Sequence, residues 1–346
     1  MRWIGSWGAA PSGQGRIFSN TDLRQTVRLG AGGDAVRLRL SNEFGDAALL
    51  VGAASAGGVP VTFGGRPDCA VPAGAPVVSD PVPLAVPALA ELEVVLRLPG
   101  RTPTSSWHAA AYRENRAGSE VITSWHFLTG VAVRAPGAAV VALGDSITEG
   151  AVTTMNANRR WPDRLASRLP GLGVVNAGIG GNRLLHDAVP GSARRGHSAL
   201  RRFDRDIAAV PGARWVVVLL GTNDLGHPGH AAPRSQEVSV ADLVAGHRQL
   251  VARAHALGLL AYGGTIPPFG GHPQFGTPAN EAARLAVNDW IRTGGGYDAV
   301  VDADAALRDP AAPGRLRAAY DSGDGLHPND AGMAALADAV PLDLFD

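Results

Sequence analysis

The stretch VVALGDSITEG, residues 140–150, passes directly from an apolar run into a polar segment bounded by glycines. A short apolar run without alternation is typical of a strand that is buried on both faces of a parallel sheet. Ser146 stands where this strand is expected to end. A serine there is either an exposed nucleophile or the cap of an ordinary helix, and the ends of the other strands decide between the two.

Apolar strands alternate with helical stretches through the rest of the chain. We expect strands at 139–143, 173–177, 215–220, 259–264 and 298–302. We expect helices at 161–169, 198–210, 240–257, 279–293 and 329–339. This alternation predicts a doubly wound, flavodoxin-like α/β domain with a parallel sheet, which we assign to residues 135–346.

The first third of the chain has a different pattern. Runs with period-two alternation occur at 35–40, 48–55 and 92–99, and Gly- and Pro-rich turns separate them. Short alternating strands of this kind predict an all-β, jelly-roll-like sandwich, which we assign to residues 1–134. Residues 133–139, VRAPGAA, are expected to link the two domains.

Four tryptophans of the first domain, at positions 3, 7, 107 and 125, are expected to anchor its core, with a sugar-stacking platform as the alternative. The segment SSWHAAAYRE, residues 105–114, is where we expect this domain to contact the catalytic rim.

Composition excludes several classes of function. The chain has 31 basic and 31 acidic residues, so it lacks the basic face of a nucleic-acid-binding protein. Its single cysteine, Cys69, excludes an intrachain disulfide, and no compact metal-ligand spacing occurs, so we expect neither a metal nor a cofactor. No apolar run approaches the roughly 18 residues of a membrane span.

The opening residues, MRWIGSWGAAPSG, lack the long apolar stretch of a signal peptide. We therefore expect a cytoplasmic protein, with a secreted protein whose signal has been removed as the alternative. The sequence carries no indication of an oligomeric state.

Polar groups with complementary chemistry follow the expected strands. Ser146 follows the first, NAGIGGN (176–182) the second and GTND (221–224) the third, and DSGDGLHPND (321–330) comes after the last strand and a loop. The carboxyl ends of parallel strands meet at one edge of a sheet, where ligands bind. These groups are therefore expected to share one rim.

The residue types at this rim suit acyl transfer. A serine hydroxyl becomes a strong nucleophile when an imidazole accepts its proton, and Asp324, three residues before His327, can hold the second ring nitrogen. Glycine N–H groups and an asparagine amide can bind the oxyanion that develops.

In this order, GDSITEG, NAGIGGN, GTND and DGLHP resemble the four signature blocks of the GDSL/SGNH hydrolase superfamily, over residues 138–346. The N-terminal pattern is similar to that of two-domain bacterial members with a β-sandwich before the catalytic domain. The resemblance implies that Ser146 is the nucleophile and that His327 and Asp324 complete a triad. An α/β-hydrolase is disfavoured, because its G-x-S-x-G elbow would need glycine where Thr148 stands.

The resemblance also implies an oxyanion hole formed by the N–H groups of Ser146 and Gly181 and the side chain of Asn223. Gly181 is chosen over Gly178 and Gly180 because it directly precedes the polar residue of its block.

The walls of a substrate pocket are expected among the neighbouring Gly- and Pro-rich loops. The candidates are Asn182, His227, Phe269, His272 and Phe275. The arginines between positions 194 and 205, which alternate with Asp204 and Asp206, are interpreted as a solvated, salt-bridged helix face.

Together these features predict a serine esterase that hydrolyses carboxylic esters through an acyl-enzyme. Short acyl or acetyl esters are favoured, with a small metabolite or a carbohydrate as the alcohol part. An acyltransferase with the same triad is one alternative. A carbohydrate-binding protein with a structural SGNH domain is the other.

Overall fold

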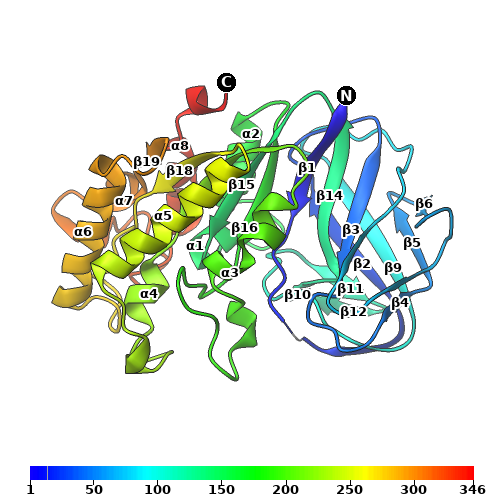
Figure 1. The fold of residues 1–346 in the computed structure, drawn as a ribbon, viewed down its shortest axis with the longest axis horizontal. Helices are drawn as coiled ribbons and strands as arrows, with labels where there is room; N and C mark the ends of the chain where they lie inside the picture. The colour runs from blue at the N-terminus through cyan, green and yellow to red at the C-terminus, as the bar shows by residue number, and fades with distance from the viewer. Residues whose placement is uncertain (14) are drawn as a thin grey trace.

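Two regions lie side by side in the computed structural model, which describes residues 1–13 and 15–346 (Figure 1). The first consists of antiparallel sheets and ends with β14 (Leu128–Ala135). The second is a helix-covered parallel sheet and begins with β15 (Ala139–Gly144). Only residues 136–138 connect them, a shorter link than expected, because β14 stays paired with β1 as far as Ala135.

The first region is a β-sandwich, as predicted. One antiparallel sheet has the order β1-β14-β3-β8 and adds β1 (Arg2–Gly8), β3 (Val36–Ser41) and β8 (Pro76–Val78) to β14. The other has the order β12-β11-β2-β9-β5-β6 and comprises β12 (Glu120–Ile122), β11 (Asn115–Ala117), β2 (Ile17–Arg28), β9 (Glu91–Pro103), β5 (Ala53–Ala56) and β6 (Val59–Val61). Two short pairs complete it: β10 (Trp107–His108) with β13 (Trp125–His126), and β4 (Leu49–Val51) with β7 (Cys69–Val71).

Period-two alternation explains how this region packs. In β3 the side chains of Val36, Leu38 and Leu40 are fully buried in one apolar core, while the arginines between them are partly exposed. Trp7 and Trp125 pack edge to face in the same core, with ring centroids 5.0 Å apart. The core interpretation of the tryptophans is therefore confirmed for these two, whereas Trp3 and Trp107 are only partly buried.

The second region is built on a five-stranded parallel sheet with the order β16-β15-β17-β18-β19. Its other strands are β16 (Gly173–Gly178), β17 (Ala213–Leu219), β18 (Leu260–Gly264) and β19 (Ala299–Val301). The first two strands along the chain exchange places in the sheet, which is the flavodoxin-like order, and the predicted fold class is confirmed.

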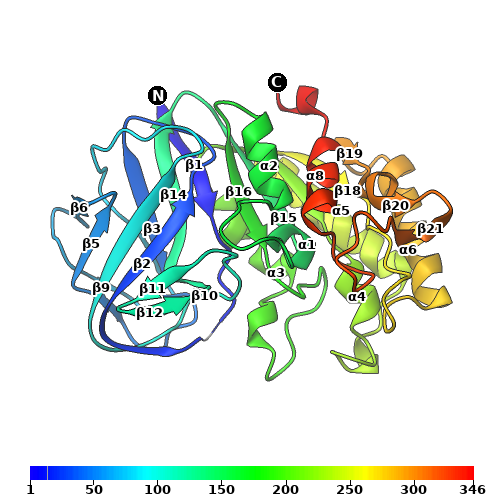
Figure 2. The same ribbon diagram turned by 180° about the vertical axis from the view of Figure 1, so that it is seen from behind.

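Helices cover both faces of this sheet (Figures 1 and 2). Val140 and Ala142 share a core with α2 and α8, and Val141 and Leu143 share another with α3, α5 and α6. The helices are α1 (Ser146–Glu149), α2 (Trp161–Arg168), α3 (Ala199–Phe203), α4 (Thr222–Gly226), α5 (Val240–Ala256), α6 (Pro278–Thr293), α7 (Ala303–Leu307) and α8 (Asp330–Asp338). Shorter elements are η1 (Ala193–Arg195), η2 (Asp204–Ala208), η3 (Arg234–Gln236), η4 (Leu342–Phe345) and the hairpin of β20 (Arg308–Asp309) and β21 (Ala312–Leu316).

The sequence did not predict the short helices α1, α4 and α7, and the single helix expected at 198–210 is divided. It is α-helical through α3 and continues as the π-helical turn η2.

The two regions meet where β1 runs beside β16, the edge strand of the parallel sheet (Figures 1 and 2). The backbones approach so closely that a Cβ atom on Gly173 would lie 1.8 Å from the carbonyl oxygen of Gly5. Ala9, just beyond β1, forms a parallel bridge with Asn176. The sandwich is thus packed directly against the strand that leads to the second sequence block.

Candidate active site

Ser146 lies at the carboxyl end of β15, as the first residue of α1. Asp145 caps this helix, since its Oδ1 accepts a hydrogen bond of 3.0 Å from the N–H of Ile147. The chain turns sharply here, because a Cβ atom on Gly144 would lie 2.0 Å from Thr148 Oγ1. The hydroxyl is partly exposed, and the N–H of Ser146, in the first turn, has no acceptor within the helix.

His327 lies directly beside Ser146, although 181 positions separate them in the chain. Its Nε2 is 2.9 Å from Ser146 Oγ, and its Nδ1 is 2.6 Å from Asp324 Oδ2. A carboxylate only accepts hydrogen bonds, so Nδ1 carries the proton and Nε2 is free to accept the serine proton. The three residues form a continuous Ser-His-Asp chain of hydrogen bonds.

Asp324 is held as an anion. Partial burial alone would raise the pKa of its carboxyl, but hydrogen bonds from the His327 side chain and from the N–H groups of His327 and Leu326 hold it well below its usual range. A fixed negative charge at this place orients the imidazole and stabilises it when protonated.

The second sequence block forms a tight turn next to Ser146. The N–H of Asn182 donates a hydrogen bond of 3.0 Å to the carbonyl of Ile179, and Gly181 has φ +72°, as the third residue of a type II turn requires. That bond does not use the N–H of Gly181, which belongs to the central peptide of the turn. A residue with a Cβ atom would be strained at this position.

Asn223 connects the first three blocks. It lies in α4, and its Nδ2 donates to Asp145 Oδ2 at 3.2 Å and to the carbonyl of Asn182 at 3.0 Å. Its side chain is buried. The amide is therefore held beside the Ser146 helix and the Gly181 turn, where the sequence predicts it.

A model of the GDSL-like lipase/acylhydrolase family matches residues 142–335, more than half of the chain. The chain belongs to this family. Membership makes it a carboxylic ester hydrolase. The matched stretch begins within β15 and ends within α8, so it covers the parallel-sheet region and leaves the β-sandwich outside.

Solved structures with a similar fold include a GDSL-like lipase from Bacteroides thetaiotaomicron VPI-5482, with 19% identity, a TM-score of 0.41, and coverage of 58% of this chain and 84% of the other. The aryl esterase of M. smegmatis is 18% identical to this chain, with a TM-score of 0.47, and the match covers 59% of this chain and 96% of the esterase. An acetyl xylan esterase from Geobacillus stearothermophilus is 22% identical to this chain, with a TM-score of 0.43, and the match covers 59% of this chain and 93% of the other. These similarities are too low to transfer a substrate. The comparison with curated proteins found no match.

Three buried carboxyl groups surround the site, and the sequence analysis assigned none of them a role. Burial raises the pKa of Asp145 and of Glu149 to about 7, and that of Asp224 to about 6. Asp224 accepts hydrogen bonds from the N–H groups of Leu184 and Leu185, which fixes the chain that follows the Gly181 turn. The sequence signals these groups only by their place in the motifs: Asp145 directly precedes Ser146, Asp224 directly follows Asn223, and Glu149 lies three residues after Ser146.

The predicted solvated arginine face is wrong at Arg202, which is buried. Its side chain has no exposed surface, and its guanidinium donates to the carbonyls of Gly144 and Ala177, to Asn182 Oδ1 and to Asp206. The sequence shows the same i, i+4 spacing of Arg and Asp whether that helix face meets water or protein. Here it meets the ends of β15 and β16 and satisfies their last carbonyl groups.

Of the five predicted pocket residues, only His272 is partly exposed, and it lies on the loop that touches the His327 loop at Gly271 and Gly325. The other four are buried, and their place in a pocket wall stays a prediction: Asn182, His227, Phe269 and Phe275. The amide of Asn182 donates to the carbonyls of residues 195 and 197, and the two phenylalanines belong to the core. Their loops are rich in Gly and Pro, but apolar side chains within them still fold inward.

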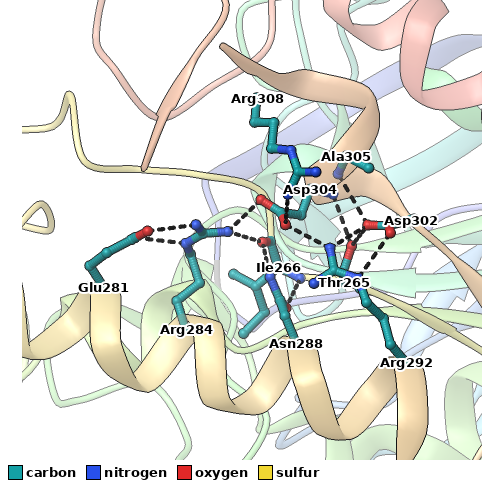
Figure 3. A network of polar contacts seen from close by, with 10 residues as sticks. All are labelled: Thr265, Ile266, Glu281, Arg284, Asn288, Arg292, Asp302, Asp304, Ala305 and Arg308. Carbon is teal, nitrogen blue, oxygen red and sulfur yellow. Dashed lines mark hydrogen bonds and ion pairs between the residues drawn. The ribbon is translucent and has the colours of Figure 1, made fainter. Parts of the chain in front are cut away.

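A charged network holds the loop that carries His272 (Figure 3). From α6, Arg284 and Asn288 donate to the carbonyl of Ile266 at 3.0 and 2.9 Å, immediately after β18. Arg284 also pairs with Asp304 of α7 at 2.7 Å, and both side chains are almost fully buried. The base of the loop is therefore fixed from two helices.

Among residues 1–13 and 15–346, no group of three or more His, Cys, Asp or Glu side chains is arranged to hold a metal ion. Nor does any helix in these ranges combine the length and apolarity needed to cross a membrane.

Proposed function

We propose that the protein is a serine esterase that cleaves carboxylic esters of short acyl groups through an acyl-enzyme on Ser146. The observation that carries this proposal is the unbroken chain from Ser146 Oγ through His327 to Asp324, with distances of 2.9 and 2.6 Å. The chain lies beside the Gly181 turn and the Asn223 amide, which supports an oxyanion hole at the same place.

In the first step His327 Nε2 takes the hydroxyl proton while Ser146 Oγ attacks the acyl carbonyl carbon. The carbonyl oxygen becomes an oxyanion that the N–H groups of Ser146 and Gly181 bind. His327 then gives its proton to the departing alkoxide, and the alcohol leaves. Water repeats the sequence on the acyl-serine and releases the acid.

Asn223 supplies the third donor by giving up one of its present hydrogen bonds and donating to the oxyanion in its place. Both hydrogens of its amide are engaged in this structure, and the bond of 3.2 Å to Asp145 is the longer of the two. Burial raises the pKa of Asp145 to about 7, so this carboxyl is only partly ionised near neutral pH and competes less strongly for the amide than a fully ionised carboxylate would. An oxyanion is a stronger acceptor and replaces it during the reaction.

A small acyl group and a polar alcohol fit this site. Ser146 and His327 are partly exposed and the side chain of Asp324 is 40% exposed, which means that the triad opens to solvent. The nearby aromatic side chains, Phe269 and Phe275, are enclosed in the core and offer no free apolar wall to a long chain.

The test is hydrolysis of p-nitrophenyl esters from acetate to laurate by the intact protein and by Ser146→Ala. We expect activity that is greatest on the shortest esters and absent in the variant. Activity that rises with chain length would contradict the short-acyl assignment, and an active variant would contradict the serine mechanism. Product analysis with added alcohols separates hydrolysis from acyl transfer.

A further inference from the structure

The sandwich reaches the catalytic rim through one buried side chain. His108 of β10 is almost fully buried, and its Nε2 lies 3.6 Å from Oε1 of Glu149, the last residue of α1. It belongs to the segment 105–114, where the sequence predicts a contact with the rim. Glu149 is only three residues after Ser146.

The hydrogen bonds of His108 fix which of its nitrogens faces Glu149. Nδ1 lies 2.9 Å from the carbonyl oxygen of Ala10, which only accepts, so Nδ1 carries the proton. In the neutral ring Nε2 is then an acceptor that faces Glu149 across 3.6 Å, beyond hydrogen-bond distance, and a protonated carboxyl is a more favourable neighbour for it than an ionised one. Burial lowers the pKa of His108 to about 4 and raises that of Glu149 to about 7, which favours a proton on the carboxyl over one on Nε2.

The other side of Glu149 meets the Gly181 turn. The Glu149 carboxyl packs against Gly180, since a Cβ atom on Gly180 would lie 2.7 Å from Glu149 Oε2, and the Gly180 N–H lowers the pKa of this carboxyl while burial raises it. Gly180 directly precedes Gly181, whose N–H the proposed function assigns to the oxyanion. Moving Glu149 would therefore rotate or loosen the peptide that carries this donor.

We propose that His108 and Glu149 act together as positioning residues that set the Gly181 N–H for catalysis, so that the β-sandwich takes part in building the oxyanion hole. The inference rests on the proposed function, because it assumes that Gly181 binds the oxyanion. Neither residue touches the reacting atoms, and both act through Gly180. Removing them should lower kcat and leave KM nearly unchanged, because the donor binds the transition state more strongly than the substrate.

Other charges face this pair from the elements around it. Arg160, Asp145 and His327 act on Glu149, and Tyr112 of the sandwich lies close to the same carboxyl. Arg160, Arg202 and Asp206 act on His108. Because these groups remain in every variant below, differences between variants report on the pair itself.

The experiment measures kcat and KM on p-nitrophenyl acetate from pH 6 to pH 9, using the full chain. Glu149→Gln keeps an acceptor for Gly180 and adds a permanent donor for His108, so we expect kcat within about twofold of wild type near pH 6.5. Wild-type kcat should fall above pH 7, where loss of the Glu149 proton leaves two acceptors facing each other. The Gln variant should lack that fall.

Glu149→Ala should lose roughly 10- to 100-fold in kcat, a part of what removing a whole oxyanion donor costs. His108→Asn places an amide where Nδ1 stands, so it keeps the Ala10 contact and loses the one to Glu149; we expect a loss of roughly 10-fold. Glu91→Gln is the matched control, since Glu91 also joins the two regions, at Asn158, but lies away from the turn. Its kcat should be that of wild type.

The outcomes separate this inference from the function on which it rests. An active Ser146→Ala variant would overturn the proposed function itself. If Ser146→Ala is inactive but Glu149→Ala and His108→Asn keep the wild-type kcat, the positioning role is wrong. If Glu149→Ala fails to fold, Glu149→Gln and His108→Asn still test the positioning role. That role would be refuted if the pH profiles of kcat for wild type and Glu149→Gln had the same shape and the kcat of His108→Asn were unchanged.

Discussion

The β-sandwich and the rim of the parallel sheet differ in where their ion pairs lie. In the sandwich the ion pairs lie on the surface, as with Arg24 and Glu93, whose side chains are 48% and 50% exposed. At the rim the corresponding pairs are enclosed: Arg202 and Asp206 are 0% and 2% exposed, and Arg284 and Asp304 are both 1% exposed.

The difference follows from how each region satisfies its backbone. Ladders pair the sandwich strands, so its buried side chains are apolar or uncharged polar ones. At the rim the strands end and the chain turns through loops, which leaves carbonyl groups without ladder partners. Arg202 donates to the carbonyls of Gly144 and Ala177, and Arg284 donates to that of Ile266, so the site depends on buried charge.

The largest expected effect is a loss of catalytic activity that leaves the stability of the fold unchanged. Ser146→Ala removes one partly exposed hydroxyl, and we expect kcat to fall by at least about 10⁴-fold while the melting temperature stays within a few degrees. Ester hydrolysis and thermal unfolding of the same preparation check this. A variant that is inactive because it is unfolded would show that even this position of the rim serves stability.

Arg202→Met tests the contrast directly. It removes the Arg202 hydrogen bonds to four buried oxygen acceptors, and we expect a loss of roughly 3–5 kcal/mol in the free energy of unfolding. Arg24→Ala, at an exposed pair, should cost less than about 1 kcal/mol. Urea unfolding of both variants gives the comparison, and equal losses would remove the distinction between the two regions.

Asn223→Ala sharpens the assignment of the oxyanion hole. We expect kcat to fall by roughly 10²- to 10³-fold with the fold retained, as for one donor removed elsewhere. Steady-state kinetics on p-nitrophenyl acetate measure the loss. An unchanged kcat would mean that the amide serves only its two present acceptors, Asp145 and Asn182.

The smallest expected effect is a dependence of stability on pH. The pKa of Glu149 is raised from 4.5 to about 7 by burial, so the folded protein binds this proton more tightly than the unfolded chain does. The contribution is therefore fully present below about pH 4.5 and is lost as the pH rises to about 7. Between pH 5 and pH 8, Glu149→Gln should lose less unfolding free energy than wild type, by roughly 1–3 kcal/mol. Parallel pH curves would contradict the buried, protonated state.

Sequence reasoning found the parts of this molecule that local pattern determines. Apolar runs locate the five parallel strands, whereas the alternating runs locate only part of the sandwich and miss β1, β2 and β14. The four blocks bring Ser146, His327 and Asp324 to one rim, because parallel strands end together. It missed what depends on tertiary contact. Arg202 has the spacing of a solvated salt bridge, and Phe269 lies in a loop that looks exposed; both are buried, because neighbouring elements cover them.

The placement of β1 beside β16 has a consequence for the edge of the parallel sheet. The edge strand of an open sheet presents unpaired backbone groups on which a second molecule can pair, and soluble proteins cover or blunt such edges. Here a strand from the sandwich takes that place, with backbones so close that Gly173 tolerates no side chain. A parallel-sheet region produced on its own from residue 135 would therefore be prone to aggregate, whatever its intrinsic activity.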